Sequence, residues 1–211
     1  MKNITDYMCS SRIGSLRRTR TVLSRSLFEL LCRYLHSVDV FSATVLPNML
    51  NLDQLDLSEN NLSDCFPMFV QQLTLCNLQM LGFENCQLTD MDIATFGQTI
   101  KDSHLKSLHV LNVSGNPEVS PTAWKGFFDM LSQTGLPTLA ELNFAQGHMR
   151  AASSVRGTQD DMFQALLKMA ERLITLCHVN THGWEVSPNV LSELETTLAN
   201  NSEESATVHS M

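Results

Sequence analysis

A cysteine directly followed by a histidine, Cys177–His178, is the pair in this chain whose residue types could support nucleophilic catalysis, with the imidazole as base for the thiol. Neighbouring residues of an extended segment point in opposite directions, so we interpret Cys177 instead as a packed core thiol. His178 and His182 stand four residues apart, a spacing that would place two metal ligands on one face of a helix. Asn180 and Gly183 disfavour a helix there. We therefore predict no catalytic residue, no metal site and no cofactor.

The segment SLFELLCRYL, residues 26–35, raises a second chemical possibility, because it resembles the elongin-binding box of ubiquitin-ligase adaptors. That box has the form S/T-Leu-x-x-x-Cys-x-x-x-aliphatic, and here Cys32 arrives one residue late. Apolar residues recur near helical spacing between residues 21 and 35, so an amphipathic helix explains the segment better. A substrate-recognition adaptor of a ubiquitin ligase therefore stays as the alternative function.

The elements that must position any functional residue follow from a motif that recurs four times, Leu-x-x-Leu-x-(Leu/Phe/Val)-x-x-(Asn/Cys/Gly). The copies begin at Leu52, Leu78, Leu108 and Leu139, which are 26, 30 and 31 residues apart. Their last positions are Asn60, Cys86, Asn116 and Gly147. A fixed period of this length is typical of a leucine-rich repeat solenoid, in which each copy buries its apolar edge against the next. We expect the polar residue that ends each copy to bond backbone groups of the turn.

Each motif precedes a segment with a capping residue and apolar residues at helical spacing. The expected helix starts are Ser63–Asp64, Thr89–Asp90, Ser120–Pro121, the capping box of Thr158 with Asp161, and Ser187–Pro188. The repeats therefore alternate strand and helix and resemble the ribonuclease-inhibitor-like leucine-rich repeats, from about Leu52 to Gly147. The predicted fold class is α/β, a right-handed solenoid with parallel strands on the concave side and helices on the convex side. The resemblance implies an intracellular, non-enzymatic scaffold and transfers no functional residue.

Four segments make up the expected domain organisation: a flexible basic arm (1–20), an N-terminal helical cap or degenerate repeat (21–50), the solenoid with a C-terminal cap (51–198) and a disordered polar tail (199–211). The sequence around Leu173 and Leu176 could start a fifth, degenerate strand. We expect Trp124 in the core, whereas the pattern leaves Trp184 either exposed or closing the C-terminal end. Residues 147–157 form an irregular loop that either binds a partner or merely connects elements.

Alternation along the strands sends the residues between the leucines to the concave face. The predicted partner-binding residues are Gln54, Asp56, Ser58, Met80, Glu84, Val110, Asn112, Ser114, Glu141 and Asn143. This set is small, polar and acidic, with one methionine and one valine, so it suits a basic or mixed protein surface. A concave face that is merely solvated is the other interpretation.

Charge restricts the class of partner. Residues 1–35 hold seven Lys or Arg against two acids, while the remaining residues hold seven against twenty, which gives net charges of +5 and −13. An acidic solenoid repels phosphates, so we expect no nucleic acid at the repeats, and no apolar stretch predicts a membrane partner. A homodimer through the N-terminal end of the solenoid stays open.

Six cysteines without paired spacing, together with an N-terminus that lacks an apolar signal region, predict a cytoplasmic protein, with the nucleus as a second compartment.

Overall fold

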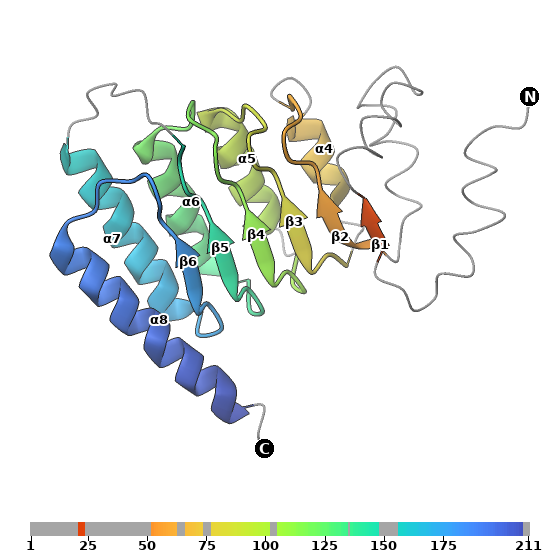
Figure 1. The fold of residues 1–211 in the computed structure, drawn as a ribbon. Helices are drawn as coiled ribbons and strands as arrows, with labels where there is room; N and C mark the ends of the chain where they lie inside the picture. Colours follow the sequence, from red (N-terminus) through yellow and green to blue (C-terminus); the bar gives the residue numbers. More distant parts are fainter. Residues whose placement is uncertain are drawn as a thin grey trace, which may run out of the picture.

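The computed structural model describes residues 21–23, 52–62, 66–73, 77–101, 105–134, 136–147 and 156–208. From β2 onward, the described strands and helices alternate (Figure 1). The strands are β1 (Thr21–Leu23), β2 (Leu52–Asp56), β3 (Met80–Gly82), β4 (Val110–Asn112), β5 (Glu141–Asn143) and β6 (His178–Asn180). The helices are α4 (Phe66–Gln72), α5 (Asp90–Lys101), α6 (Pro121–Thr134), α7 (Arg156–Arg172) and α8 (Pro188–Val208). Each described helix is either too short or too polar to cross a lipid bilayer.

All six strands form one parallel sheet in the order of the sequence, and the helices lie along one side of it (Figure 1). This is the predicted leucine-rich repeat solenoid. The register places the middle apolar residue of each repeat in one row, which consists of Leu55, Leu81, Leu111, Leu142 and Val179. The four leucines of this row are buried beneath the helices, so they set which side of each strand faces the core.

β6 supplies a fifth repeat, although its strand begins later than the sequence around Leu173 suggested. Leu173 and Leu176 are buried in the connection that precedes it. Val179 pairs with Leu142, so Leu176, Val179 and Trp184 take the positions that Leu139, Leu142 and Gly147 hold in the fourth repeat. Trp184 thus stands where the second and third repeats carry Cys86 and Asn116.

Donors at this motif position bond backbone carbonyls of the preceding repeat. Cys86 Sγ lies 3.2 Å from Leu57 O, Asn116 Nδ2 lies 2.9 Å from Phe83 O, and Trp184 Nε1 lies 2.9 Å from Phe144 O. All three side chains are buried. The expectation that the motif's polar position binds backbone is confirmed, and an indole performs the role at the C-terminal end.

Aromatic rings connect the repeats through the core. Phe66, Phe83 and Phe96 meet edge to face, with centroids 5.0 to 5.9 Å apart. The contacts continue through α6 and β5 to Trp184, whose ring centroid lies 5.8 Å from that of Phe144. Trp124 is buried as predicted, and Trp184 is 8% exposed, which makes it part of the C-terminal closure. Such offset and edge contacts add to the stabilisation from burial.

Three helices, α5, α6 and α8, start at the predicted caps. The predicted cap Ser63–Asp64 lies outside the described residues, and the start of α7 differs from the prediction. Thr89 and Asp92 form a capping box before α5, in which Thr89 N donates to Asp92 Oδ2 at 2.9 Å. Ser120 caps α6 and is itself held by Asp90, whose carboxylate accepts from Ser120 N at 2.6 Å and from its hydroxyl at 2.8 Å. α8 begins at Pro188, as predicted. α7 begins at Arg156, so residue 158 lies inside its first turn rather than at its cap.

The N-terminal end differs from the expected helix over residues 21–35, because Thr21–Leu23 form strand β1 beside β2. Two of these residues are β-branched, and the pairing satisfies backbone groups along the edge of β2. The predicted basic arm, the remainder of the predicted N-terminal cap and residues 148–155 of the irregular loop lie outside the described residues.

The C-terminal end also differs, because α8 continues to Val208 through most of the predicted disordered tail. Asn201 is the anchor: it is buried, and its Nδ2 donates to Ala170 O at 2.9 Å, Leu173 O at 3.3 Å and Leu176 O at 2.9 Å. The last carbonyls of a helix such as α7 need donors from outside the helix. A polar side chain therefore holds the terminal helix where the sequence offers few apolar ones.

Candidate partner-binding surface

The side of the sheet opposite the helices carries three rows of side chains, which we call the concave face. The first row is Gln54, Met80, Val110, Glu141 and His178. The second row is Asp56, Gly82, Asn112, Asn143 and Asn180. The third row, just past the strands, is Ser58, Glu84, Ser114, Ala145 and His182. The structure thus places all ten predicted residues on one surface.

Side chains of the second row bond the backbone and thereby hold the strand ends in shape. Asp56 Oδ1 accepts from the backbone N–H two residues later at 3.0 Å, and the side-chain oxygens of Asn112, Asn143 and Asn180 do the same at 3.1, 3.2 and 3.1 Å. These are Asx turns, which hold the chain where it leaves the sheet. Gly82 interrupts the row because a Cβ there would lie 2.7 Å from Asp56 Oδ1. This row is therefore better suited to shaping the face than to contacting a partner.

A polar network ties the second row to the third across β2, β3 and β4. Asn112 Nδ2 donates to Glu84 Oε2 at 3.1 Å, and Asn112 Oδ1 accepts from the Ser114 hydroxyl at 2.7 Å. Ser58 Oγ accepts from Glu84 N at 3.1 Å. Ser114 is 4% exposed, so it offers little surface to a partner. The network fixes the position of the Glu84 carboxylate on the face.

The first row consists of side chains suited to contact with another molecule. Met80 and Val110 are neighbours in the register and are both half-buried. Gln54 lies on one side of them, and the exposed Glu141 and His178 lie on the other. Within the described part of the chain, no hydrogen bond of the Gln54, Glu141 or His178 side chains is seen. A small apolar centre between polar ends is a common arrangement in protein interfaces.

Five positions of the concave face lie outside the ten predicted residues. Gly82 and Ala145 belong to repeats that the motif identified, whereas His178, Asn180 and His182 belong to a repeat that it missed. All three belong to β6 or follow it directly. The signal was available in the spacing of Leu176 and Val179, which repeats that of Leu139 and Leu142. Thr181 stands where the earlier copies carry a third apolar residue, so the motif was incomplete.

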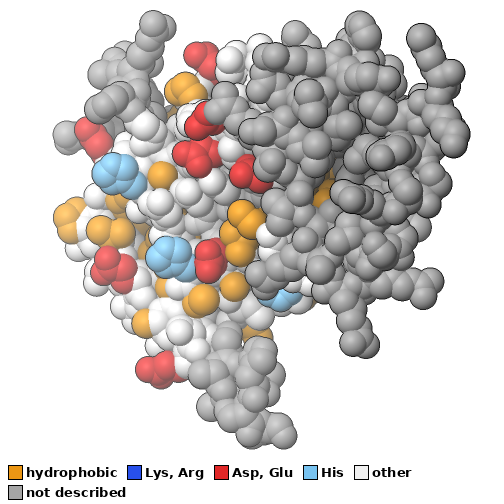
Figure 2. Space-filling model, turned by 45° about the vertical axis from the view of Figure 1, so that its right-hand side comes forward, with side chains coloured by type: hydrophobic (Ala, Val, Ile, Leu, Met, Phe, Trp, Pro, Cys, Tyr) orange, Lys and Arg blue, Asp and Glu red, His pale blue; other side chains and the backbone are white. Residues whose placement is uncertain are grey.

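The charges of the concave face have one sign. Asp56, Glu84 and Glu141 are acidic, and none of the fifteen row positions is Lys or Arg. In the view of Figure 2, acidic, histidine and hydrophobic side chains of the described residues are interspersed, and none of the coloured side chains has the colour of Lys or Arg. On α6, by contrast, Lys125 donates to Asp129 at 2.7 Å, and this hydrogen bond together with the carboxylate charge raises the pKa of Lys125. The field on the strand side therefore favours cations.

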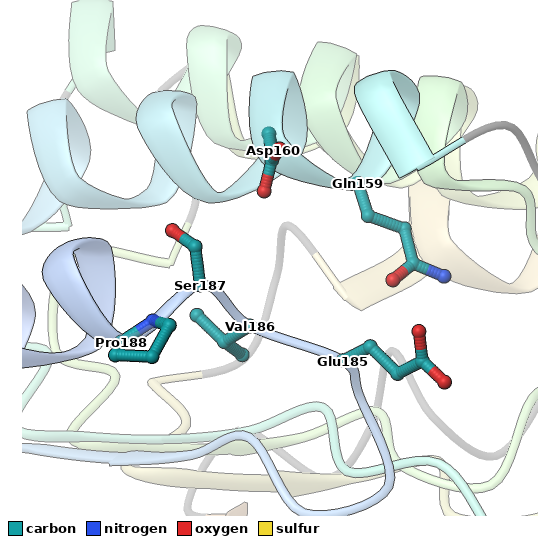
Figure 3. A pocket seen from close by; sticks show the side chains of 6 residues that line it. All are labelled: Gln159, Asp160, Glu185, Val186, Ser187 and Pro188. Carbon is teal, nitrogen blue, oxygen red and sulfur yellow. The ribbon is translucent and has the colours of Figure 1, made fainter.

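A hollow of about 350 Å³ lies between α7 and the segment that leads into α8. Figure 3 shows Gln159 and Asp160 of α7 opposite Glu185 and Ser187. The lining combines two carboxylates with one hydroxyl and one amide. In the part of the chain that the structure describes, no hydrogen bond joins the Ser187 hydroxyl to either carboxylate, as activation of a nucleophile by a base would require. Among the described residues, no group of three metal-ligating side chains occurs here or elsewhere.

The structure places both pairs of residues that the sequence marked as chemically interesting, Cys177–His178 and His178 with His182. Cys177 is exposed, so its interpretation as a core thiol is wrong; its side chain lies at the start of the fifth repeat, 3.6 Å from Ala140 O. The buried position belongs to Leu176, one residue earlier. His178 lies in a strand rather than a helix, and with His182 it extends the rows of the concave face. Neither histidine shares a cluster that could hold a metal ion within the described ranges.

Comparisons with known proteins agree with this architecture. A family model for the Leucine Rich Repeat matches residues 51–73. Curated proteins give no match. Among solved structures, the chain is similar to leiomodin-1 actin-binding site 2, with a TM-score of 0.64, 14% identity and coverage of 82% of this chain and 94% of that one. It is also similar to the tropomodulin C-terminal domain of Caenorhabditis elegans, with a TM-score of 0.63, 16% identity and coverage of 82% and 98%. At these identities the likeness concerns the fold alone.

Proposed function

We propose that this chain is a non-enzymatic leucine-rich repeat scaffold that binds a protein partner on its concave face. The observation that carries the proposal is the one-sided cover of the sheet. Helices lie along one side (Figure 1), and the register places three rows of side chains on the other. Stacked repeats present such a surface on a rigid frame, because each repeat is held by its neighbours. The buried leucine row and the backbone bonds of Cys86, Asn116 and Trp184 supply that rigidity.

The residues expected to contact the partner are a subset of those predicted from the sequence. Gln54, Met80, Val110 and Glu141 belong to the first row, and Glu84 belongs to the third, with Gly82 between it and Met80. His178 extends the first row by one strand. The second-row residues and Ser58 act indirectly, since their bonds to the backbone hold the strand ends and the Glu84 segment. Truncating a first-row side chain should therefore reduce binding without a matching loss of stability.

A narrower relationship supports the same class of function. Residues 78–116, the PTAWKGFFDML helix and the LAELNF strand resemble leucine-rich repeat-containing protein 31. We propose a scaffold of that kind in the cytoplasm, with the nucleus as a second compartment. The free thiols of Cys86 and Cys177 fit a reducing environment. The homodimer through the N-terminal end stays a proposal, because residues 1–20 and 24–51 lie outside the described part of the chain.

The ubiquitin-ligase alternative depends on residues 26–35, which lie outside the described part of the chain. This alternative predicts that the full chain binds elongin in a pull-down. It also predicts that the variants Leu27→Ala and Cys32→Ala lose this binding. Elongin capture that is absent, while a partner is still recovered through the concave face, would leave the simple scaffold.

Actin is the first defined protein to test, because the leiomodin-1 structure is named as an actin-binding site. The experiment is co-sedimentation of the full chain with filamentous actin and gel filtration with monomeric actin. Binding that charge reversal on the concave face abolishes would identify the partner. No binding in either format would remove actin and leave the scaffold proposal intact.

The test of the scaffold compares two double charge reversals in the full chain. Glu84→Arg with Glu141→Arg changes the concave face, and Glu193→Arg with Glu195→Arg makes the same change in charge on the exposed side of α8. Both proteins are checked by thermal unfolding and then used in proximity labelling and affinity purification. Partners lost by the concave variant and kept by the α8 variant support the proposal. Identical partner lists from both folded variants would contradict it.

A further inference from the structure

The concave face has two kinds of side chain. Those of the second row bond the backbone at the strand ends, whereas those of the first row can contact a ligand. The oxygens of Asp56, Asn112, Asn143 and Asn180 accept backbone N–H groups of their own strand ends. The first row makes no such bonds among the described residues. Glu84 is the acidic side chain of the third row that the polar network holds in place. The first row and Glu84 therefore determine the chemistry of a partner that binds this face.

The centre of the first row is apolar and adaptable. Met80 and Val110 lie side by side on adjacent strands and are half-buried, so each presents part of its side chain to solvent. Methionine adjusts to ligands of different shape because it is unbranched and polarisable. The hollow described above, which could hold a larger side chain, lies elsewhere, between α7 and Glu185. One or two aliphatic side chains of a partner fit this centre.

Two carboxylates lie around that centre in different directions. Glu141 is the next residue of the first row beyond Val110. Glu84 lies toward the strand ends, in the third row of the repeat of Met80, with Gly82 between them. Asp56 adds a third negative charge on β2, and the row positions contain no Lys or Arg. A cation that approaches the apolar centre from either of these directions meets a carboxylate without crossing a like charge. Phosphates of nucleic acids and of anionic lipids are repelled for the same reason.

The first row also limits the length of the ligand. It crosses five strands from Gln54 to His178, and neighbouring strands lie about 4.8 Å apart, so the row is about 19 Å long. An extended segment of about six residues covers that length at ~3.3 Å per residue. A helix needs about thirteen residues at ~1.5 Å per residue.

We propose that the concave face binds a basic segment of another protein, in which Lys or Arg flanks one or two aliphatic side chains. The aliphatic side chains lie on Met80 and Val110, and the cations pair with Glu84 toward the strand ends and with Glu141 beyond Val110. This assignment rests on the proposed function, since it names the partner class of the same surface. It excludes acidic peptides, nucleic acid and anionic lipid as ligands of this face.

The experiment is selection of a displayed library of random peptides, about 16 residues long so that a helix can cross the whole row. The bait is the immobilised full chain, and the variant Glu84→Arg with Glu141→Arg is selected in parallel. Peptides from the wild-type selection are then synthesised, and their affinity is measured by fluorescence anisotropy. Met80→Ser tests the apolar centre, and Glu193→Arg with Glu195→Arg is the matched control on α8.

Enrichment of peptides with Lys or Arg around Leu, Ile, Val or Met supports the proposal. Their affinity should fall about tenfold or more in the concave charge reversal and hardly change in the α8 control. It should also fall several-fold between about 0.15 M and about 0.5 M salt. Higher affinity after Arg17, Arg18 and Arg20 are changed to Gln would show that the chain's own basic arm competes for the face, which supports the same chemistry.

Two results would overturn the proposal and are distinguishable from failure of the scaffold function. Enriched peptides that are acidic or aromatic, yet depend on Met80 and Glu141, would show that the face binds but that the partner class is wrong. The same peptides from wild type and the concave variant, or no enrichment from either, would show that this face does not select basic segments. Neither result by itself contradicts the scaffold function. The scaffold function is contradicted if the labelling and purification experiment in cells finds no partner that depends on the concave face.

Discussion

Asn116 offers the sharpest test of how the solenoid holds its binding surface in place. Its side chain is fully buried and bonds groups of two repeats. Asn116 Oδ1 accepts from Cys86 N at 3.0 Å and Leu88 N at 3.1 Å. Its Nδ2 donates to Phe83 O at 2.9 Å and also to two carbonyls of its own turn. Replacing Asn116 with Ala therefore removes the partners of two buried amides in the second repeat.

The expected cost follows from those two amides. Each buried N–H left without an acceptor costs about 1–3 kcal/mol, so Asn116→Ala should reduce the free energy of unfolding by about 2–6 kcal/mol. Asn60 occupies the same motif position in the first repeat and provides the control. It is half-buried, and its Nδ2 bonds carbonyls of its own turn at 2.8 and 3.2 Å. Asn60→Ala should cost about 1 kcal/mol or less, because water can replace those bonds.

The assay uses two signals that report on different parts of the chain. Far-ultraviolet circular dichroism follows all the helices, whereas both tryptophans, Trp124 and Trp184, lie after Asn116 in the sequence. A weakened contact between the second and third repeats lets the N-terminal side unfold first, because stability in a solenoid is a sum over neighbouring repeats. In Asn116→Ala the circular dichroism transition should therefore begin before the fluorescence transition. Coincident transitions with a loss no greater than that of Asn60→Ala would refute the reasoning.

Three further changes test the C-terminal closure and the turns. Trp184→Phe keeps an aromatic ring but loses the 2.9 Å hydrogen bond to Phe144 O. The free energy of unfolding, measured by chemical denaturation, should therefore fall by about 1–2 kcal/mol. A decrease of less than half that value would show that the indole hydrogen bond has no structural role. Asn201→Ala should cost a similar amount and speed amide exchange in residues 199–208, while the exposed Asn200→Ala should change neither. Gly183 has a φ of +84° and its added Cβ would meet Gln146 O, so Gly183→Ala should destabilise by about 2 kcal/mol. Gly126→Ala, in an open position of α6, should instead stabilise by about 0.5–1 kcal/mol, and thermal midpoints that move alike in both variants would contradict the steric argument.

The repeating part of the protein could be predicted from local sequence patterns. Leucines at fixed spacing must point to one side of a strand, so the buried row and the three outward rows followed directly from the motif. Capping residues located the starts of α5, α6 and α8 for an equally local reason, since each satisfies backbone groups within a few residues. The ten predicted residues of the concave face lie together because every repeat obeys the same rule.

Tertiary structure decided what happens where the repetition stops. Trp184 and Asn201 end the array with bonds to carbonyls that lie 40 and 31 residues earlier in the sequence, and no local pattern announces such partners. Within the concave face, too, hydrogen bonds depend on the tertiary structure. The Asn112 side chain accepts from the backbone at its own strand end and donates to Glu84 of the neighbouring repeat. Spacing predicts which side of the sheet a residue occupies, because that depends on the chain's own geometry. Whether its polar atoms are left for a partner depends on the groups that folding brings beside them.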